Sequence, residues 1–213
     1  QFVPVAFDEL ISSLLAGKGD IAAAFLTMTP ERIEVVDFVD PQGRLVDEIL
    51  VANKNAEPIE KLTDLSGRTV YVLKGSSYAL HLSELNKRLN LVDLPAVNIV
   101  NANNQLLTED LLELVNAGII AYTFCDDFKA KLWAKALPNI RLNKSVKLSS
   151  GQPVGWVIRP NSPLLQAALN TFSNNVRKGT LLGNILFNKY YASTRWINNP
   201  LAKSERDKFE QTI

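Results

Sequence analysis

The segment from Leu15 to Phe38, LAGKGDIAAAFLTMTPERIEVVDF, constrains the fold of this chain more than any other stretch. Gly17 and Gly19 end an amphipathic helix that the apolar spacing predicts over residues 7–16. Residues 20–26 are small and apolar, which is typical of a strand that is buried on both faces. A polar crossing and a short helix follow, so the segment has the helix–strand–helix order of an α/β fold.

Polar side chains follow the end of this predicted strand. Thr27 and Thr29 place hydroxyls there, and Arg32 follows within one helical turn. Thr29 can also cap the next helix, with Pro30 at its first position. A planar guanidinium binds a carboxylate through two parallel hydrogen bonds, and ligands of open α/β sheets usually bind beyond strand ends. We therefore predict a carboxylate receptor at Thr27, Thr29 and Arg32.

Three short motifs in this region resemble the signature of the family 3 periplasmic solute-binding proteins. They are G-x-G-D at residues 17–20, L-T-x-T-x-x-R at residues 26–32 and V-D-F at residues 36–38. The resemblance implies a two-lobed periplasmic binding protein type 2 fold with a two-strand hinge, and a small solute bound between the lobes. It also implies that Arg32 holds the α-carboxylate of the ligand, with Thr27 beside it. The chain has Phe25 where binders of polar amino acids in this family often carry Ser or Gly.

Composition disfavours several other classes of protein. The 23 basic and 22 acidic residues nearly cancel, without a long basic stripe, so nucleic acid is not an expected partner. No apolar run approaches the roughly 18 residues that span a bilayer. The single cysteine, Cys125, excludes an internal disulfide and is expected to fill the core. An apolar fraction of 46% is enough for an ordinary globular core.

A chain of 213 residues corresponds to one large domain or to two lobes of about 100 residues each. With the resemblance, we expect a discontinuous lobe 1 over residues 1–55 and 148–198, and a lobe 2 over residues 56–147. Residues 199–213 are then the start of a linker to a further domain. Because two crossings between lobes make a hinge, we expect the lobes to close about a ligand.

The first residues of the chain resemble the middle of a domain rather than its beginning. Residues Gln1 to Val5 are predicted as a strand. The family has a further strand and helix ahead of this point, and that strand carries part of the binding cleft. We therefore expect the N-terminal strand and helix of lobe 1 to be absent from this sequence, which would leave an open sheet edge.

A second group of candidate residues lies in the expected lobe 2. The loop Lys74-Gly75-Ser76-Ser77 leads into a helix predicted over residues 78–89. Glycine and two hydroxyls at a helix N-terminus make a ready anion site, because unpaired amides and the helix dipole favour negative charge there. Plain N-capping by a serine explains the pattern equally well. The resemblance favours the first interpretation, because the family commonly places a hydroxyl against the ligand there.

Asp126 stands between a strand predicted over residues 119–125 and a helix predicted over residues 128–136. From position alone it is a helix N-cap. By resemblance it would pair with a ligand ammonium, so that Arg32 and Asp126 facing each other across a cleft form a minimal receptor for a zwitterion. Two charges buried by lobe closure need such partners.

A narrower resemblance concerns the tail YYASTRWINNP at residues 190–200, the motif TEDLLELVNAG at residues 108–118 and the Asp126 segment. Together they resemble the binding-protein-like regulatory module of the membrane-bound lytic murein transglycosylase F group. There, such a module precedes a catalytic domain that cleaves peptidoglycan. The resemblance implies a ligand-sensing module for a small amino-acid-like or muropeptide ligand, with a catalytic domain after residues 202–213. It also implies a periplasmic location and an association of the full-length protein with the outer membrane.

The chain itself is expected to be non-catalytic, although its parent would be a lyase. No glutamate is followed by serine, as the catalytic glutamate of those enzymes is, and Met28 is the only methionine. His81, the only histidine, follows Ser77 by four residues, and a helix-surface histidine is the simpler interpretation than a Ser–His–Asp triad. We expect no cofactor and no metal, because no His/Cys cluster is present. The alternatives are a receptor for an amino-acid ABC transporter and an independent α/β hydrolase.

Overall fold

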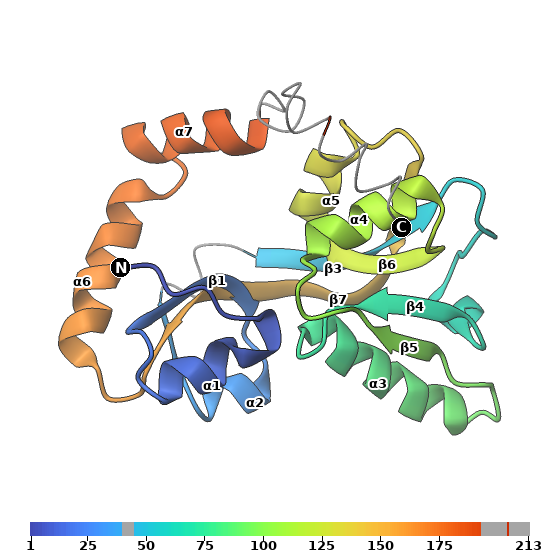
Figure 1. The fold of residues 1–213 in the computed structure, drawn as a ribbon, viewed down its shortest axis with the longest axis horizontal. Coiled ribbons are helices and arrows are strands. Elements are labelled where there is room, and N and C mark those ends of the chain that lie inside the picture. The colour runs from blue at the N-terminus through green and yellow to red at the C-terminus, as the bar shows by residue number, and fades with distance from the viewer. Residues whose placement is uncertain (40–44, 193–203, 205–213) are drawn as a thin grey trace. The chain divides into compact units, whose positions relative to one another are not determined.

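The computed structural model of the chain describes residues 1–39, 45–192 and 204, and the chain divides into two compact units. Unit 1 is built on Gln1–Val46 and Gly151–Ala192, and unit 2 is built on Asp47–Ser150. Within residues 1–39 and 45–192, the chain passes from unit 1 to unit 2 after Val46 and returns after Ser150 (Figure 1). Each unit has a hydrophobic core of its own.

The sheet of unit 1 is centred on the C-terminal half of β7 (Ile140–Ile158). Strands β1 (Ile21–Thr27) and β2 (Asp37–Val39) both pair with it in the antiparallel sense. The register of β1 shifts between Ala22 and Leu26, which marks a bulge. Among the described strands, β1 is therefore an edge strand with β7 on one side only.

The helices of unit 1 are short in its N-terminal segment and longer in the segment that follows β7. The 3₁₀ helix Phe7–Glu9 leads into α1 (Leu10–Leu15), and α2 (Pro30–Ile33) follows β1. After β7 come α6 (Pro163–Val176), α7 (Leu181–Phe187) and a π-helical turn, Asn188–Ala192. The core between α1, the strands and the segment after α2 consists of Leu14, Ala22, Leu26, Val36, Phe38 and Val157.

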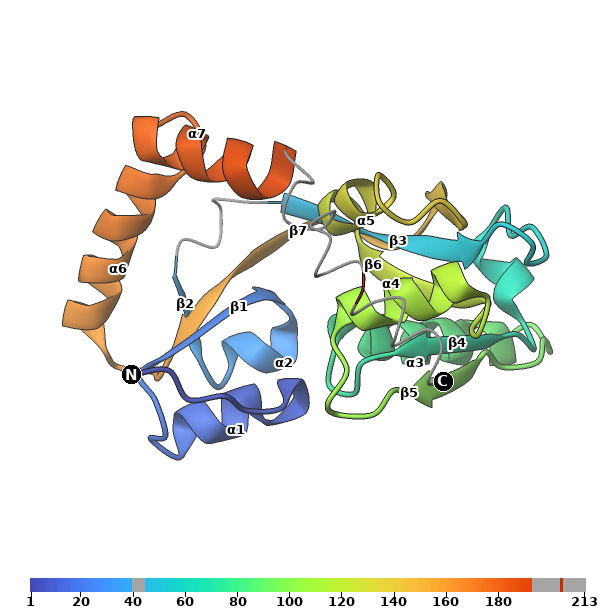
Figure 2. The same ribbon diagram turned by 45° about the horizontal axis from the view of Figure 1, so that its top comes forward.

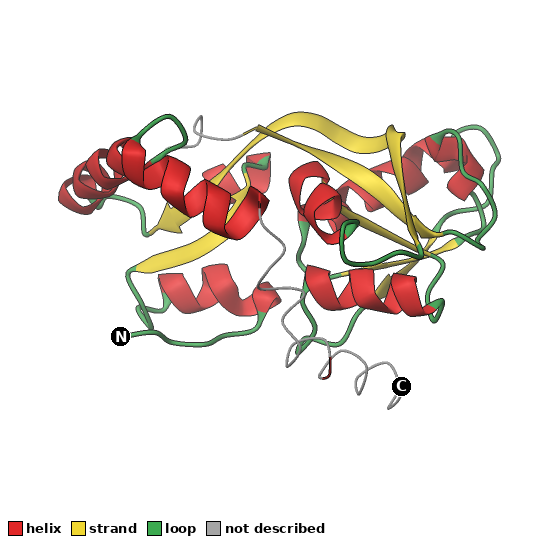
Figure 3. Ribbon diagram, turned by 90° about the horizontal axis from the view of Figure 1, so that it is seen from above, coloured by secondary structure: helices red, strands yellow, loops and turns green. Residues whose placement is uncertain are grey.

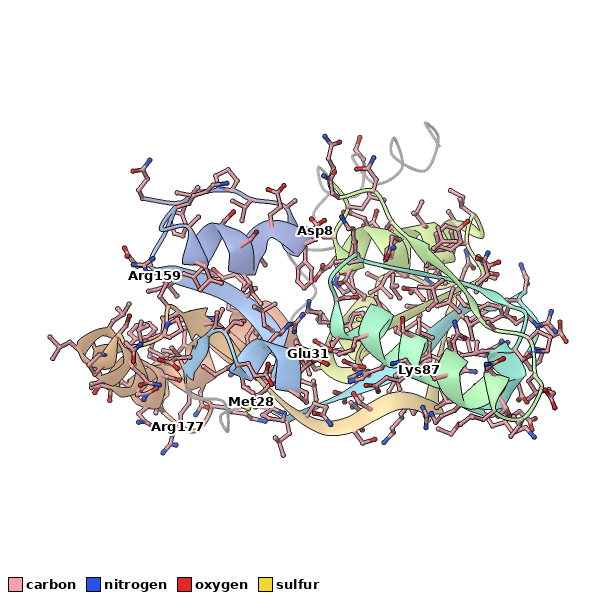
Figure 4. All side chains as sticks on the ribbon, turned by 90° about the horizontal axis from the view of Figure 1, so that it is seen from below. Asp8, Met28, Glu31, Lys87, Arg159 and Arg177 are labelled. Carbon is pink, nitrogen blue, oxygen red and sulfur yellow. The ribbon has the colours of Figure 1, made fainter. Side chains whose placement is uncertain are left out.

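Arg159 fastens the loop between α1 and β1 to the end of β7. Its guanidinium donates to the carbonyl oxygens of Leu14 (3.3 Å) and Gly19, and it pairs with Asp20 at 2.6 Å. Figure 4 labels this arginine in unit 1. Gly17 and Gly19, which end the predicted helix, therefore lie in a loop that is held by the guanidinium of Arg159.

Two expectations for unit 1 are wrong. Residues 1–5 do not form a strand, because Pro4 has no N–H to donate to a ladder and Phe2 is fully exposed at 101%. Strand β1 is not buried on both faces either, since Ile21 is 37% exposed and Phe25 is 40% exposed. The small apolar residues correctly predicted a strand here. They did not show that the described helices leave part of one face of β1 exposed to solvent.

Unit 2 has a mixed sheet in the order β7-β3-β6-β4-β5. Its strands besides the N-terminal half of β7 are β3 (Leu45–Asn53), β4 (Thr69–Val72), β5 (Asn98–Asn101) and β6 (Tyr122–Asp126). Strand β4 is parallel to β5 and β6, whereas β3 is antiparallel to β6. The end of β6 and the beginning of β3 therefore lie side by side.

Helices cover both faces of this sheet (Figures 1 and 2). The 3₁₀ helix Leu62–Leu65 precedes β4, and α3 (Ser77–Asn90) packs on one face through Leu82, Leu85 and Leu89. Helices α4 (Thr108–Ala117) and α5 (Asp127–Trp133) lie on the other face. The central strands consequently have both faces buried, as the run LVDEILVAN of β3 shows with six consecutive buried residues from Glu48 to Asn53.

Both units thus combine helices with an open sheet, and the predicted α/β class is confirmed (Figure 3). The tail motif at residues 190–200 is described only as far as residue 192, and of the linker predicted at residues 199–213 only residue 204 is described. Among the described residues, no helix has the length and hydropathy that crossing a membrane requires.

Candidate ligand-binding residues

In unit 1 the structure brings Thr27, Thr29 and Arg32 together at the end of β1. All three residues are buried, and only 9% of the surface of Arg32 is exposed. The guanidinium of Arg32 donates from Nη1 to the carbonyl oxygen of Thr27 at 2.8 Å. The backbone N–H of Arg32 donates to the carbonyl oxygen of Thr29 at 3.1 Å, which closes the first turn of α2. Thr29 is the N-cap residue and Pro30 is the first helical residue, as predicted, but the Thr29 side chain makes no capping hydrogen bond.

A guanidinium in this position suits recognition of an anion. It has five N–H donors in a fixed plane, and the bond to Thr27 fixes the orientation of that plane. A largely buried charge is stabilised when opposite charge and acceptors surround it. A carboxylate that meets the fork edge-on can accept two parallel hydrogen bonds from it. The binding of a carboxylate by Arg32 stays a prediction.

In unit 2 the two serines have different partners. Ser76 is the N-cap of α3, since its Oγ accepts from the N–H of Ala79 at 3.3 Å and donates to the carbonyl of Leu73 at 2.6 Å. Ser77 instead donates from Oγ to Oε1 of Glu48 at 2.6 Å. The capping interpretation therefore describes Ser76, and Ser77 belongs to a side-chain cluster that the sequence did not suggest.

Glu48 is the centre of that cluster and is fully buried, with 0% exposed. Its second carboxyl oxygen, Oε2, lies 2.6 Å from Nδ1 of His81. The expectation that His81 is a helix-surface residue is wrong, because 17% of its side chain is exposed and the ring packs against β3 through Glu48. The only sequence signal was that Glu48 directly precedes an apolar run, Ile49 to Ala52.

Asp126 lies directly opposite Glu48 in the register of β3 and β6. Its Oδ1 accepts from the hydroxyl of Tyr78 at 2.8 Å, and its N–H donates back to that hydroxyl oxygen at 3.2 Å. Asp126 is the N-cap residue of α5, but its side chain makes no capping bond. Burial raises the pKa of Asp126 to about 6, against the lowering effects of the Lys129 charge and the Tyr78 hydrogen bond. Asp126 therefore changes charge near neutral pH.

A cavity of about 360 Å³ in unit 1 is a separate feature. Its wall includes Phe25 and the stacked rings of Trp156 and Phe172, whose centroids are 6.2 Å apart. Arg177 and Lys178 also line it; Figure 4 labels Arg177 beside the helices of unit 1. None of the six predicted site residues belongs to its lining, so we do not assign the predicted ligand to this cavity.

Metal ligands are not gathered in the part of the chain that the structure describes. There, no group of three or more His, Cys, Asp and Glu side chains is arranged to hold a metal ion. Cys125 is buried in β6, where burial raises the pKa of its thiol well above the usual range.

The sequence profile of the bacterial extracellular solute-binding proteins, family 3, matches residues 1–192. The chain belongs to this family. Among solved structures, an ancestral arginine-binding protein bound to arginine is similar, with a TM-score of 0.74 and 25% identity over 90% of this chain and 80% of that one. This likeness and the family match agree with the predicted binding-protein fold.

Curated relatives show which proteins carry a similar segment. The chain is 29% identical over 187 residues to the membrane-bound lytic murein transglycosylase F of Desulfosudis oleivorans, covering 88% of this chain and 39% of that protein. It is 33% identical over 186 residues to the protein of the same name from Shewanella pealeana, covering 86% of this chain and 36% of that protein. The chain thus spans less than two fifths of the length of these relatives.

Proposed function

We propose that this chain is a non-catalytic ligand-sensing module that binds a small amino-acid-like or muropeptide ligand. The observation that carries the proposal is the buried guanidinium of Arg32, held at the end of β1 beside Thr27 and Thr29 in a member of a solute-binding family. A guanidinium offers five N–H donors in one plane, and a carboxylate can accept two of them in parallel. A ligand carboxylate is the anion that the family relationship favours.

The second half of the proposed receptor lies in unit 2, at Ser76, Ser77 and Asp126. A carboxylate at Asp126 would pair with the ammonium group of a ligand whose carboxylate binds Arg32. One ligand would then contact both units, and binding would favour closure of the lobes about the hinge. The solved ancestral arginine-binding protein bound to arginine supports an amino-acid-like ligand class for this fold.

We place this module in a peptidoglycan lytic transglycosylase, in which it would precede a catalytic domain. The two curated relatives support this, since both are named as such enzymes and both are more than twice as long as the matched segment. On this proposal the full-length protein acts in the periplasm on the cell wall and is associated with the outer membrane. Delivery of an amino acid to an ABC transporter is the second candidate, favoured by the binding-protein fold alone.

Titration calorimetry tests the binding proposal directly. The chain is titrated with a panel of free L-amino acids and with peptidoglycan-derived muropeptides, and the measurement is repeated with Arg32→Ala. We expect one ligand class to bind and Arg32→Ala to remove the binding. Arg88→Ala, which changes an exposed arginine of α3, is the matched control and should leave binding intact. If a folded chain binds neither panel, the proposal is wrong.

A further inference from the structure

The three hydroxyl groups at the start of α3 share one property: each gives its hydrogen to an acceptor inside unit 2. The donor–acceptor pairs are Ser76 with the Leu73 carbonyl at 2.6 Å, Ser77 with Glu48 at 2.6 Å, and Tyr78 with Asp126 at 2.8 Å. A hydroxyl has a single hydrogen, so while these bonds last the three groups can meet a ligand only through their oxygen lone pairs. Toward a ligand, the hydroxyl groups at the start of α3 can therefore act as hydrogen-bond acceptors and not as donors.

Glu48 is the residue that imposes this state on Ser77. Its carboxyl group has no exposed surface, and a buried carboxyl is tolerated only when its oxygens are hydrogen-bonded. Oε1 takes the hydrogen of Ser77, and Oε2 is in contact with Nδ1 of His81. The partners come from successive turns of one helix, four residues apart, so α3 fixes both oxygens at once. Glu48 is thereby fixed relative to α3.

The position of Glu48 also connects it to the predicted site. It is directly opposite Asp126 in the β3–β6 pairing, and its charge is among the causes that raise the pKa of Asp126. Two carboxyl groups and an acceptor hydroxyl thus lie together where β3 begins, β6 ends and α3 begins. Such a set of oxygens suits a ligand group that carries N–H donors and positive charge, and it disfavours an anion.

We propose that Glu48, anchored by His81, is a positioning residue that makes unit 2 select ligands presenting an ammonium or guanidinium group over ligands presenting a second carboxylate. Glu48 need not contact the ligand to have this effect. Its effect passes through Ser77, whose hydroxyl it turns into an acceptor, and through its charge beside Asp126. This inference rests on the proposed function, because it concerns the selectivity of the same site.

The test compares L-arginine with L-glutamate as calorimetric probes of the unchanged chain and of Glu48→Gln. The glutamine amide can donate to Ser77, which frees the serine hydrogen for an anionic ligand and removes the negative charge. We expect Glu48→Gln to weaken L-arginine binding by about tenfold or more, since it disrupts hydrogen bonding to a charged group. The affinity for L-glutamate is expected to stay the same or to rise. Glu84→Gln, on the exposed side of α3, is the matched control and should change neither.

His81 supplies a second readout because it is the only histidine in the chain. Because no other histidine contributes a signal, the ring resonances of His81 in an NMR spectrum report on its contact with Glu48. We expect L-arginine to shift them in the unchanged chain and not in Glu48→Gln. His81→Leu, which removes one anchor and leaves the carboxyl group, should shift the preference in the same direction if Glu48→Gln fails to fold.

The outcomes separate this inference from the proposed function. Equal losses for both ligands in Glu48→Gln would show a merely structural role and overturn the inference, as would an unchanged preference for L-arginine. If the unchanged chain binds no amino acid and no muropeptide, the proposed function fails first, and the selectivity assigned to Glu48 fails with it.

Discussion

Arg32 is almost completely buried, and its guanidinium donates to the carbonyl oxygen of Thr27, five residues earlier in the chain. We predict that Arg32→Lys weakens the binding of a carboxylate ligand by about 10- to 100-fold, because lysine keeps the charge but cannot form two parallel bonds. Titration calorimetry with the ligand identified by the panel measures this. If lysine restored the full affinity that alanine removes, charge alone would explain the site and the bidentate geometry would be wrong.

Asp126 makes the stability of unit 2 depend on pH. Its folded pKa of about 6 lies above its usual value of 3.8, so the folded state holds the proton more tightly than the unfolded state does. Its contribution to stability is therefore greatest at low pH and is lost as pH rises from about 4 to about 6. Over that window its ionisation should cost about 3 kcal/mol.

We predict that Asp126→Asn has a smaller pH dependence of the free energy of unfolding across this window, because the amide does not titrate. Urea unfolding at a series of pH values measures the slope for both chains. Asp93→Asn changes an exposed aspartate and should keep the original slope. Parallel curves for the unchanged chain and Asp126→Asn would show that Asp126 does not have the raised pKa.

At the scale of single residues, the sequence predicted contacts between residues that are close along the chain. Thr27 and Arg32 are five residues apart, and the motif that contains them was enough to place them together. Ser77 and His81 reach Glu48 across 29 and 33 residues, through a strand and a helix that no spacing rule connects. The roles assigned to the six site residues by resemblance stay predictions until binding is measured.

At the scale of elements, periodic segments were predicted well. The run LVDEILVAN is typical of a strand, and it forms β3 (Leu45–Asn53). The motif TEDLLELVNAG forms α4 from Thr108, and this helix ends where Gly118 adopts a φ of +78°. Strand β7 begins at Ile140, although residues 140–145 are mostly polar, and its place in the sheet is beside β3. Hydropathy cannot reveal a strand whose place is set by its neighbours.

Gly151 lies within β7 at the boundary between the two units, with a φ of +62°. We predict that Gly151→Ala lowers the free energy of unfolding by about 1 kcal/mol, because L-residues are strained in the left-handed region. The added methyl would meet no atom within 4 Å, so the backbone and not a clash is responsible. Gly19→Ala, also in open space but without a positive φ, is the control and should be nearly neutral. Equal effects of the two changes would contradict this account.

At the scale of the whole molecule, the two separate cores predict two unfolding events. One core contains Leu14, Leu26 and Val157 in unit 1, and the other contains Leu50, Leu82 and Phe124 among its residues in unit 2. We expect differential scanning calorimetry to resolve two transitions without ligand. A ligand that contacts both units should raise both midpoints, with about 2.7 kcal/mol of stabilisation at a hundredfold excess over Kd. A rise in one transition alone would assign the ligand to one unit.

The family relationship was also readable from the sequence, because its motifs are short, local and carry charged or conformationally special residues. The identity of the ligand was not, since it depends on side chains from several elements. Glu48 illustrates this: its residue type was visible, whereas its burial and its two partners depend on how β3 and α3 pack.

Among the described residues, β1 lies at an edge of its sheet and the helices α6 and α7 leave large apolar side chains exposed, so we expect unit 1 to associate through this apolar surface. No apolar side chain of α6 or α7 is buried, and Leu164 and Leu181 are 88% and 81% exposed. We expect the isolated chain to bind the dye ANS while fully folded and to scatter more light as its concentration rises. Leu181→Lys should reduce both signals and leave ligand binding unchanged. Sulfate should increase the scattering, because it strengthens apolar association, whereas a purely electrostatic attraction would weaken with added salt.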